Sequence, residues 1–250
     1  MKAKKSFNIL HLSLVFIILL SVTNSVSAMQ SNKVLVFSKT KGFKHKSIPA
    51  GIAAIKKLAL ENNFIADTTT NAEFFTESNL KQYKTVIFLS PTGDILNDTQ
   101  QKAFEKYIKT GGGFVGIHSA TDCEFDWEWY GNLVGAYFSA HPKQQNAILN
   151  VVDKNHLSTK NLPKEWKRFD EWYNFKWMAP NLNVLITIDE TSYDAGPKKM
   201  GANHPMAWYH DFDGGRSFNT ALGHTDESYE EPLFLEHLLG GIKYAMGLKK

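Results

Sequence analysis

Short apolar runs alternate along the chain with segments whose apolar residues recur at helical spacing. Runs of strand character occupy residues 33–38, 64–69, 84–90 and 114–117, and each has the length of a buried strand. Amphipathic helical segments lie between them. Strands separated by helices predict parallel strands joined by right-handed crossovers. The first half of the chain therefore predicts a parallel sheet covered by helices.

Polar residues indicate where three helices begin. The predicted starts are Ser47 with Pro49 in the first turn, a capping box of Asp98 and Gln101, and a second capping box of Ser228 and Glu231. In a capping box two side chains satisfy the free N–H groups at the helix end. The last of these starts predicts a C-terminal helix.

The second half of the chain is less regular. Residues 147–152, 183–188, 206–212 and 216–222 have strand character, and Asp213-Gly214-Gly215 between the last two predicts a hairpin turn. No linker divides the chain after residue 28. The fold class predicted is α/β, with a doubly wound, mainly parallel sheet and helices on both faces, in a single domain over residues 29–250.

The first 28 residues have the pattern of an export signal. A basic start with Lys2, Lys4 and Lys5 precedes an apolar stretch at residues 9–20, and Val26-Ser27-Ala28 supplies small residues for cleavage after Ala28. The alternative is a membrane anchor, but the apolar stretch is short for a span of ~20 residues. The sequence predicts a cleaved signal peptide, no membrane anchor afterwards, and a periplasmic or secreted protein.

The charge of the chain without this segment excludes one class of partner. Three of the 28 Lys and Arg lie in the segment and none of the 25 Asp and Glu do, so the remainder is balanced at 25 of each. Phosphate binding requires a cationic surface. We therefore expect no nucleic acid partner.

The single cysteine, Cys123, rules out an internal disulfide, and we expect it to be a small buried residue.

Three histidines follow predicted strands. His45 follows the first strand, His118 stands in the step Gly116-Ile117-His118-Ser119-Ala120, and His224 follows Leu222-Gly223. Small neighbours around His118 are typical of a nucleophile elbow, a tight turn that holds one side chain in a pocket. Ligands of open α/β sheets bind beyond the carboxyl ends of the strands. A convergent site is one interpretation; histidines that satisfy backbone groups or lie at the surface are the alternative. Of the other histidines, His141, His156, His204, His210 and His237, all after residue 28, are interpreted mainly as structural or surface residues.

The segment from Arg168 to Tyr173 adds two adjacent carboxylates. On a strand, Asp170 and Glu171 would point to opposite faces, so only one of them could face a pocket. Three imidazoles with Glu171 would make a zinc site, although no metal-binding spacing occurs in the sequence. No metal ligand is therefore assigned from the sequence, and the cofactor is left undecided, with a divalent metal as the candidate.

Aromatic and acidic residues alternate at residues 122–130 (DCEFDWEWY). Rings cover the apolar faces of sugars, and carboxylates accept hydrogen bonds from hydroxyl groups. Asp122 and Trp127 are the candidate substrate contacts here, with Phe43 and Tyr173 from other loops. The alternative is that the rings belong to the core and the acids to a solvated face.

Several ordered motifs together resemble one family. They are residues 42–48 (GFKHKSI), 112–120 (GGFVGIHSA), 170–173 (DEWY), 205–208 (PMAW), 215–218 (GRSF) and 222–224 (LGH). Through these motifs the chain resembles the trehalose-utilisation (ThuA-like) family over nearly its whole length after residue 28. The resemblance implies a flavodoxin-like fold, similar to class I glutamine amidotransferases, whose nucleophile is a cysteine at the elbow. His118 occupies that place, so glutaminase chemistry is not expected.

The resemblance implies carbohydrate metabolism, in particular of trehalose-like disaccharides and their oxidised (3-keto) forms. The leading hypothesis is an exported protein that binds a small carbohydrate and hydrolyses or isomerises it. His118, His45, His224 and Glu171 are the candidate catalytic residues, and Asp122, Tyr173, Trp127 and Phe43 the candidate substrate-binding residues. A non-catalytic sugar-binding or structural module is the alternative. The sequence does not indicate the oligomeric state.

Overall fold

The computed structural model describes Met1 and residues 32–248. The chain divides into two units, Met1–Gln30 and Ser31–Lys250, and the described strands and helices all belong to the second. The predicted signal peptide lies outside the described residues. No helix in the part that is described has both the length and the apolar character to cross a membrane.

A nine-stranded sheet forms the centre of the fold, in the order β2-β1-β3-β4-β11-β10-β9-β6-β7. Its first half is parallel from β2 to β11, which confirms the α/β fold predicted from the alternating pattern. The parallel strands are β1 (Lys33–Phe37), β2 (Ile65–Thr69), β3 (Thr85–Leu89), β4 (Gly113–Ile117) and β11 (Gly215–Thr220). All residues of β3 and β4 are buried, as expected for strands covered on both faces.

The other half of the sheet is antiparallel. The hairpin predicted at residues 213–215 joins β11 to β10, and the next three strands continue the antiparallel order. These strands are β10 (Pro205–Phe212), β9 (Asn183–Ile188), β6 (Gln145–Val151) and β7 (Glu165–Asp170). Two further strands, β5 (Ala136–Ala140) and β8 (Asn174–Met178), pair with each other in a small second sheet.

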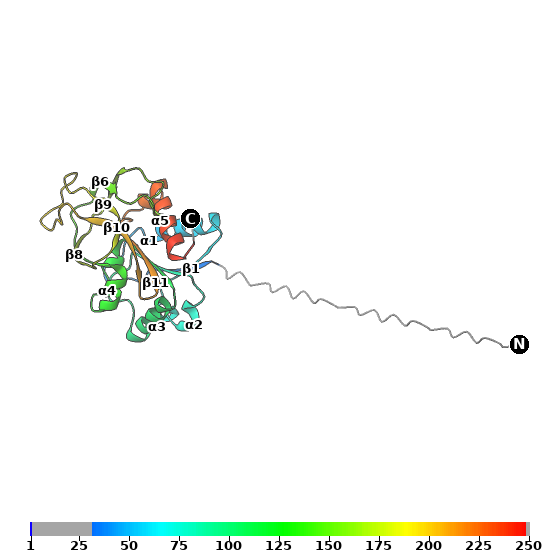
Figure 1. The fold of residues 1–250 in the computed structure, drawn as a ribbon. Coiled ribbons are helices and arrows are strands. Elements are labelled where there is room, and N and C mark those ends of the chain that lie inside the picture. The colour runs from blue at the N-terminus through cyan, green and yellow to red at the C-terminus, as the bar shows by residue number, and fades with distance from the viewer. Residues whose placement is uncertain (2–31, 249–250) are drawn as a thin grey trace. The chain divides into compact units, whose positions relative to one another are not determined.

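Helices cover both faces of the main sheet (Figure 1). One face carries α1 (Ile48–Glu61) and α5 (Pro232–Ala245), and the other carries α2 (Glu77–Leu80), α3 (Asp98–Lys109) and α4 (Glu128–Val134). Short 3₁₀ segments occur at η1 (Ala72–Phe74), η2 (His118–Thr121) and η3 (Glu227–Tyr229). Two separate apolar clusters result, one on each side of the sheet.

The helix starts differ in detail from the predicted ones. The capping box of α3 is formed by Asn97 and Gln100, one residue earlier than predicted. Ser47 stands before α1 but makes no side-chain cap; its hydroxyl donates to the Gly223 carbonyl at 3.4 Å. No side chain caps α5, which begins at Pro232 after Glu231. Ser47 and Ser228 are instead used in long-range contacts, which local spacing does not reveal.

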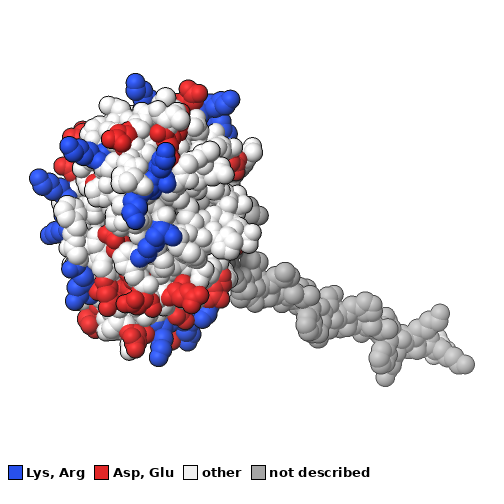
Figure 2. Space-filling model, turned by 90° about the vertical axis from the view of Figure 1, so that its left-hand side faces the viewer, with Lys and Arg blue, Asp and Glu red and all other residues white. Residues whose placement is uncertain are grey.

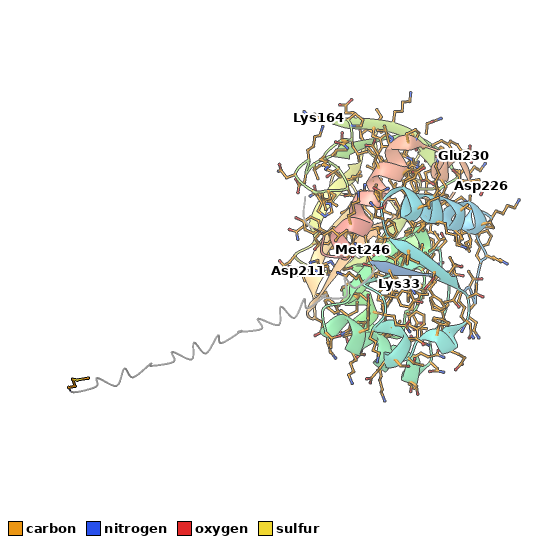
Figure 3. The ribbon with its side chains drawn as sticks, turned by 90° about the vertical axis from the view of Figure 1, so that its right-hand side faces the viewer. Lys33, Lys164, Asp211, Asp226, Glu230 and Met246 are labelled. Atoms are coloured by element: carbon orange, nitrogen blue, oxygen red, sulfur yellow. The ribbon has the colours of Figure 1, made fainter. Side chains whose placement is uncertain are left out.

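The carboxyl ends of the parallel strands lie at one edge of the sheet. In Figure 3, Lys33 marks the start of β1 and Met246 follows α5, whereas Asp226 and Glu230 lie beyond the other end of that helix. The segment with Asp226 follows β11, so it belongs to the edge where ligands bind in this class of fold. The loops after β1, β4 and β11 all reach this edge.

The burial of His237 makes the stability of the fold depend on pH. This residue of α5 is fully buried and hydrogen bonds through its ring to the Ser158 carbonyl and the Thr220 hydroxyl. Burial lowers the pKa of His237 to about 3, against ~6.5 in an unfolded chain. Between these values the unfolded chain binds a proton that the folded chain does not. Stability therefore falls as the pH falls below 6.5, by up to about 1.4 kcal/mol per pH unit for this group.

We expect His237→Gln to remove this contribution from the pH dependence of the unfolding free energy, measured by urea denaturation between pH 6.5 and pH 4. The wild type, measured over the same pH range, is the reference and should lose more stability towards pH 4 than the variant does. An unchanged slope in His237→Gln would contradict the assignment.

Candidate active site

His118 lies at a strained turn directly after β4. Its φ is +53°, in the left-handed region, and η2 begins at the same residue. A Cβ on Gly116 would lie 2.2 Å from the Asn219 amide oxygen and 3.0 Å from the Cβ of Ala120. Glycine is therefore needed at position 116 for the close approach of β11 and η2. The elbow geometry inferred from the small residues is present, with an imidazole where a nucleophile would stand.

The contacts of the His118 ring define its tautomer. Nδ1 lies 3.0 Å from the Ala221 carbonyl oxygen, so Nδ1 must carry the proton and donate it. In the neutral ring Nε2 is then unprotonated. That atom lies 3.1 Å from His224 Nδ1 and 3.5 Å from a carboxylate oxygen of Glu171. The basic nitrogen of His118 is therefore directed at the other polar groups of the site.

His45 completes a group of three imidazoles. Its ring centre lies 4.7 Å from that of His118 and 5.1 Å from that of His224, and its Nδ1 lies 3.4 Å from the Ser119 hydroxyl. Burial, helped by the two neighbouring imidazoles, lowers the pKa of His45 to about 3. His45 is thus neutral near pH 7. The three loops that follow β1, β4 and β11 bring their histidines together, as the convergent interpretation required.

Glu171 stands among these rings. One carboxylate oxygen lies 3.0 Å from His224 Nδ1, and the other lies 3.2 Å from His141 Nδ1. Burial raises the pKa of Glu171, but hydrogen bonds from His118 and His224 outweigh it and hold the pKa well below its usual range. The carboxylate remains charged. His141 is exposed, as interpreted from the sequence, but it also contacts the site, and the sequence pattern did not indicate that role.

Asp170 and Glu171 have different roles, although both carboxylates are buried. Glu171 lines the cavity of the site and Asp170 does not, in line with the expectation that only one of them could face a pocket. Asp170 accepts from the backbone N–H groups of Gly223 and His224 at 2.8 and 3.0 Å. It also pairs with buried Arg168 at 3.1 Å. Asp170 therefore positions the His224 turn from behind the pocket.

The site opens into a cavity of about 390 Å³. The residues that line it include six of the predicted site residues and three that the sequence did not indicate. They are Phe43, His45, Asp122, Phe138, His141, Gln144, Glu171, Tyr173 and His224. His118 lies below them with a fully buried side chain.

Burial raises the pKa of Asp122 to about 6, although the charge of His118 opposes the shift.

Rings form part of the cavity wall. The Tyr173 ring lies 4.4 Å from that of His118 and 4.3 Å from that of Phe138, centre to centre. Phe43 is 65% exposed at the rim and meets His45 edge to face. A larger hollow of about 930 Å³ adjoins the site and shares Phe43, Gln144 and His224 with it. Phe43 and Tyr173, two of the candidate substrate contacts, therefore both lie at the cavity.

Trp127 is placed elsewhere. Its ring stacks on Trp129 and Tyr130, and its N–H donates to Glu105 at 3.2 Å. Trp127 therefore does not line the cavity with the other candidate substrate contacts; it belongs to the buried apolar cluster that includes residues of α3 and α4. Neighbouring Glu124 is structural too, since it accepts from the backbone N–H groups of Ile95 and Leu96.

Cys123 is buried, as predicted from the sequence. Its thiol contacts the Ala120 carbonyl and the Tyr130 hydroxyl, and burial raises its pKa well above the usual value. Such a thiol is not a nucleophile. Cys123 therefore has a structural place in the fold, and the residue at the elbow is His118.

Four side chains of the site have the composition of a metal-ligand set. His45, His118, His224 and Glu171 each place one ligand atom within 4.8 Å of the others. Three imidazoles and a carboxylate can ligate zinc. The same residues can also transfer protons, since an imidazole and a carboxylate lie side by side.

Comparisons with known proteins identify the family. The profile described as trehalose utilisation (ThuA) matches residues 33–245. The chain belongs to the ThuA family. No curated protein matches it. The ThuA match supports a link with carbohydrate use and leaves the reaction open.

Solved structures share the ThuA fold. A ThuA-like protein from Bacteroides uniformis is 23% identical, with 90% of this chain and 94% of that chain covered and a TM-score of 0.72. One from Parabacteroides merdae is 20% identical, with 88% and 92% covered and a TM-score of 0.73. A β-galactosidase from Bacillus circulans is 14% identical, with 88% of this chain but 32% of that chain covered and a TM-score of 0.58. At these identities the similarity concerns the fold.

Asp170 provides a test of how the site is held. We expect Asp170→Asn to lower the free energy of unfolding by up to about 3–5 kcal/mol, because the buried Arg168 charge then keeps only its contact with Glu231 at 3.4 Å. Urea denaturation measures the loss. In the double variant Arg168→Met with Asp170→Asn, part of the stability should return, since no unpaired charge remains. Equal losses in the single and double variants would show that the ion pair is not the cause.

Proposed function

We propose that this ThuA-family chain is an exported protein that binds a trehalose-like disaccharide, a glycoside or a ketosugar and processes it by hydrolysis or isomerisation. One observation carries the proposal: three imidazoles, Glu171 and Asp122 surround a single cavity with aromatic walls. The family match to trehalose utilisation supports a carbohydrate as the ligand.

The cavity has the features that sugar binding requires. Carboxylates of Asp122 and Glu171 can accept hydrogen bonds from hydroxyl groups, and the exposed ring of Phe43 can cover an apolar C–H face. Ligand pockets typically have volumes of about 300–1,000 Å³, and both adjoining hollows fall within this range. Because they share residues, they suit a substrate of two linked rings, one in each hollow.

Proton transfer is the chemistry that the site supports best. The pKa of Asp122, raised by burial to about 6, allows it to give or accept a proton near neutral pH. His118 can exchange a proton at Nε2, and the bond from its Nδ1 to the Ala221 carbonyl fixes the orientation of the ring. Glu171, which remains charged, can stabilise positive charge that develops on either neighbouring imidazole. Hydrolysis and isomerisation of sugars both need such acid–base groups.

A small carbohydrate fits the surface better than a polyanion would. The face in Figure 2 carries acidic as well as basic side chains, and the red residues gather towards its lower part. This mixture is consistent with the balanced charge of the chain after residue 28. Nucleic acid is accordingly not part of the proposal.

Turnover should depend on His118. We expect His118→Ala to reduce turnover of trehalose, its 3-keto derivative or a related glycoside by roughly 10²–10⁴-fold, the usual contribution of a general acid or base. Sugar binding, measured by calorimetry, should persist. Because His118 is buried, His118→Gln is a second variant, and circular dichroism establishes that each is folded. Binding without turnover by the wild type would favour the non-catalytic module instead.

Phe43 should contribute affinity rather than chemistry. We expect Phe43→Ala to weaken sugar binding by roughly 3- to 10-fold, corresponding to a contact of about 0.5–1.5 kcal/mol. Phe74→Ala removes another exposed phenylalanine, which lies in η1, and should leave the affinity unchanged. Equal effects of the two substitutions, measured by calorimetry, would show that Phe43 does not contact the sugar.

Export is tested separately from the site. The proposed cleavage after Ala28 gives a mature protein that starts at Met29. N-terminal sequencing of the protein recovered from the periplasm or the medium should find this start. Retention of residues 1–28 in all of the recovered protein would contradict a cleaved signal.

A further inference from the structure

We infer that His45, His118, His224 and Glu171 form a binding site for one zinc ion. The atoms that face one another are His118 Nε2, His224 Nδ1 and a Glu171 carboxylate oxygen. They form a triangle with sides of 3.1, 3.5 and 3.0 Å. In a tetrahedral zinc site with bonds of ~2.0–2.1 Å, adjacent ligand atoms are about 3.4 Å apart. The triangle already has this size.

The fourth corner is supplied by His45. One ring nitrogen of His45 lies within 4.8 Å of each of the other ligand atoms. Its Nδ1 faces the Ser119 hydroxyl, so Nε2 is the nitrogen available to ligate. A shift of up to about 1.4 Å would bring it from that distance to the ligand spacing of about 3.4 Å. His45 belongs to the loop after β1, separate from the elements that hold the other three.

One cation would fit between the ligand atoms of the cluster. The Nδ1 of His118 donates to the Ala221 carbonyl, so its Nε2 is the nitrogen that faces the Glu171 oxygen 3.5 Å away. His224 Nδ1 lies close to both of these atoms. A divalent ion placed among them could bind all four side chains at once.

Residues around the cluster make the kind of hydrogen bonds that usually orient the ligands of a metal site. A ligating histidine commonly donates its other N–H to a carbonyl, as His118 does to Ala221. The His224 backbone N–H is held by Asp170. The His224 Nε2 lies 2.7 Å from the Gln144 amide, and an amide can either accept from or donate to it. Gln144 therefore permits the tautomer in which His224 Nδ1 is free to ligate.

The donor set selects the kind of ion. Three imidazoles with one carboxylate suit zinc, whereas magnesium and calcium require mainly oxygen ligands. His45, His224 and Glu171 also line the cavity, so a bound ion would be accessible to a ligand there. The bound ion would act as a Lewis acid on a neighbouring sugar oxygen. The metal would thus add a cofactor to the site of the proposed function, but zinc binding itself does not depend on sugar turnover.

Zinc binding can be measured directly on the full chain after export, or on the same chain purified and treated with a chelator. We expect calorimetric titration with Zn²⁺ to give one site per chain, and zinc to raise the melting temperature. Cobalt bound in place of zinc should give the visible absorption bands of a tetrahedral centre. Glu171→Gln and His224→Ala should each weaken zinc binding by at least about 100-fold, more than the loss of a supporting residue.

His141→Ala is the matched control, because His141 contacts Glu171 but is not one of the four ligands. As the loss of a supporting contact, it should weaken zinc binding by about 10-fold, less than either ligand substitution does. Absence of a stoichiometric zinc site in the wild-type protein would overturn the inference. Binding that persists undiminished in both Glu171→Gln and His224→Ala would overturn it as well, since the ion would then lie elsewhere.

The metal site and the proposed function can fail independently. Zinc binding is measured without sugar, so a protein that binds zinc but turns over no sugar retains the metal site and loses the proposed reaction. A chelator-treated protein that has no zinc affinity but processes a sugar retains the proposed function and loses the metal site.

Discussion

The buried carboxylate of Asp170 is the contact on which the rest of the site depends. It stands at the end of β7, in the antiparallel half of the sheet, and accepts from the Gly223 and His224 backbone after β11, the last strand of the parallel half. Arg168 balances its charge. Burying two ions costs free energy, and the pair offsets this cost only when its other hydrogen-bonding atoms also have partners. The same bonds fix His224 and place Glu171, the next residue, beside the imidazoles.

Each half of the sheet contributes a different kind of group. The parallel half supplies His45, His118 and His224 at the ends of its strands. The antiparallel half and the small second sheet supply Glu171, His141 and the Phe138 and Tyr173 rings of the cavity wall. Neither half alone surrounds a cavity. A ligand bound there would contact residues from both, which explains why distant motifs along the chain carry the family signature.

The predictions from sequence succeeded where a general rule of the fold applies. Parallel strands end at one edge, so the sequence alone favours the convergence of His45, His118 and His224. His141 and Gln144 were missed because they follow β5, a strand of an irregular second sheet whose place no local pattern indicates. Alternation separated Asp170 from Glu171 but could not choose which one faces the pocket, because that depends on the distant turn at His224. Trp127 carried the same aromatic signal as Phe43, and only packing distinguishes a core ring from an exposed one.

The strain at His118 accounts for how one fold can serve unrelated chemistry. A left-handed residue after a strand costs free energy, of the order of 1–3 kcal/mol, and persists only because Gly116 permits the close approach of Asn219 and Ala120. This close approach depends on the backbone at the turn and not on which side chain residue 118 carries. The residue at the turn can therefore change without rebuilding the elbow. What the imidazole does is decided by the groups it meets, and here these are two further imidazoles and a charged carboxylate held in place by β7.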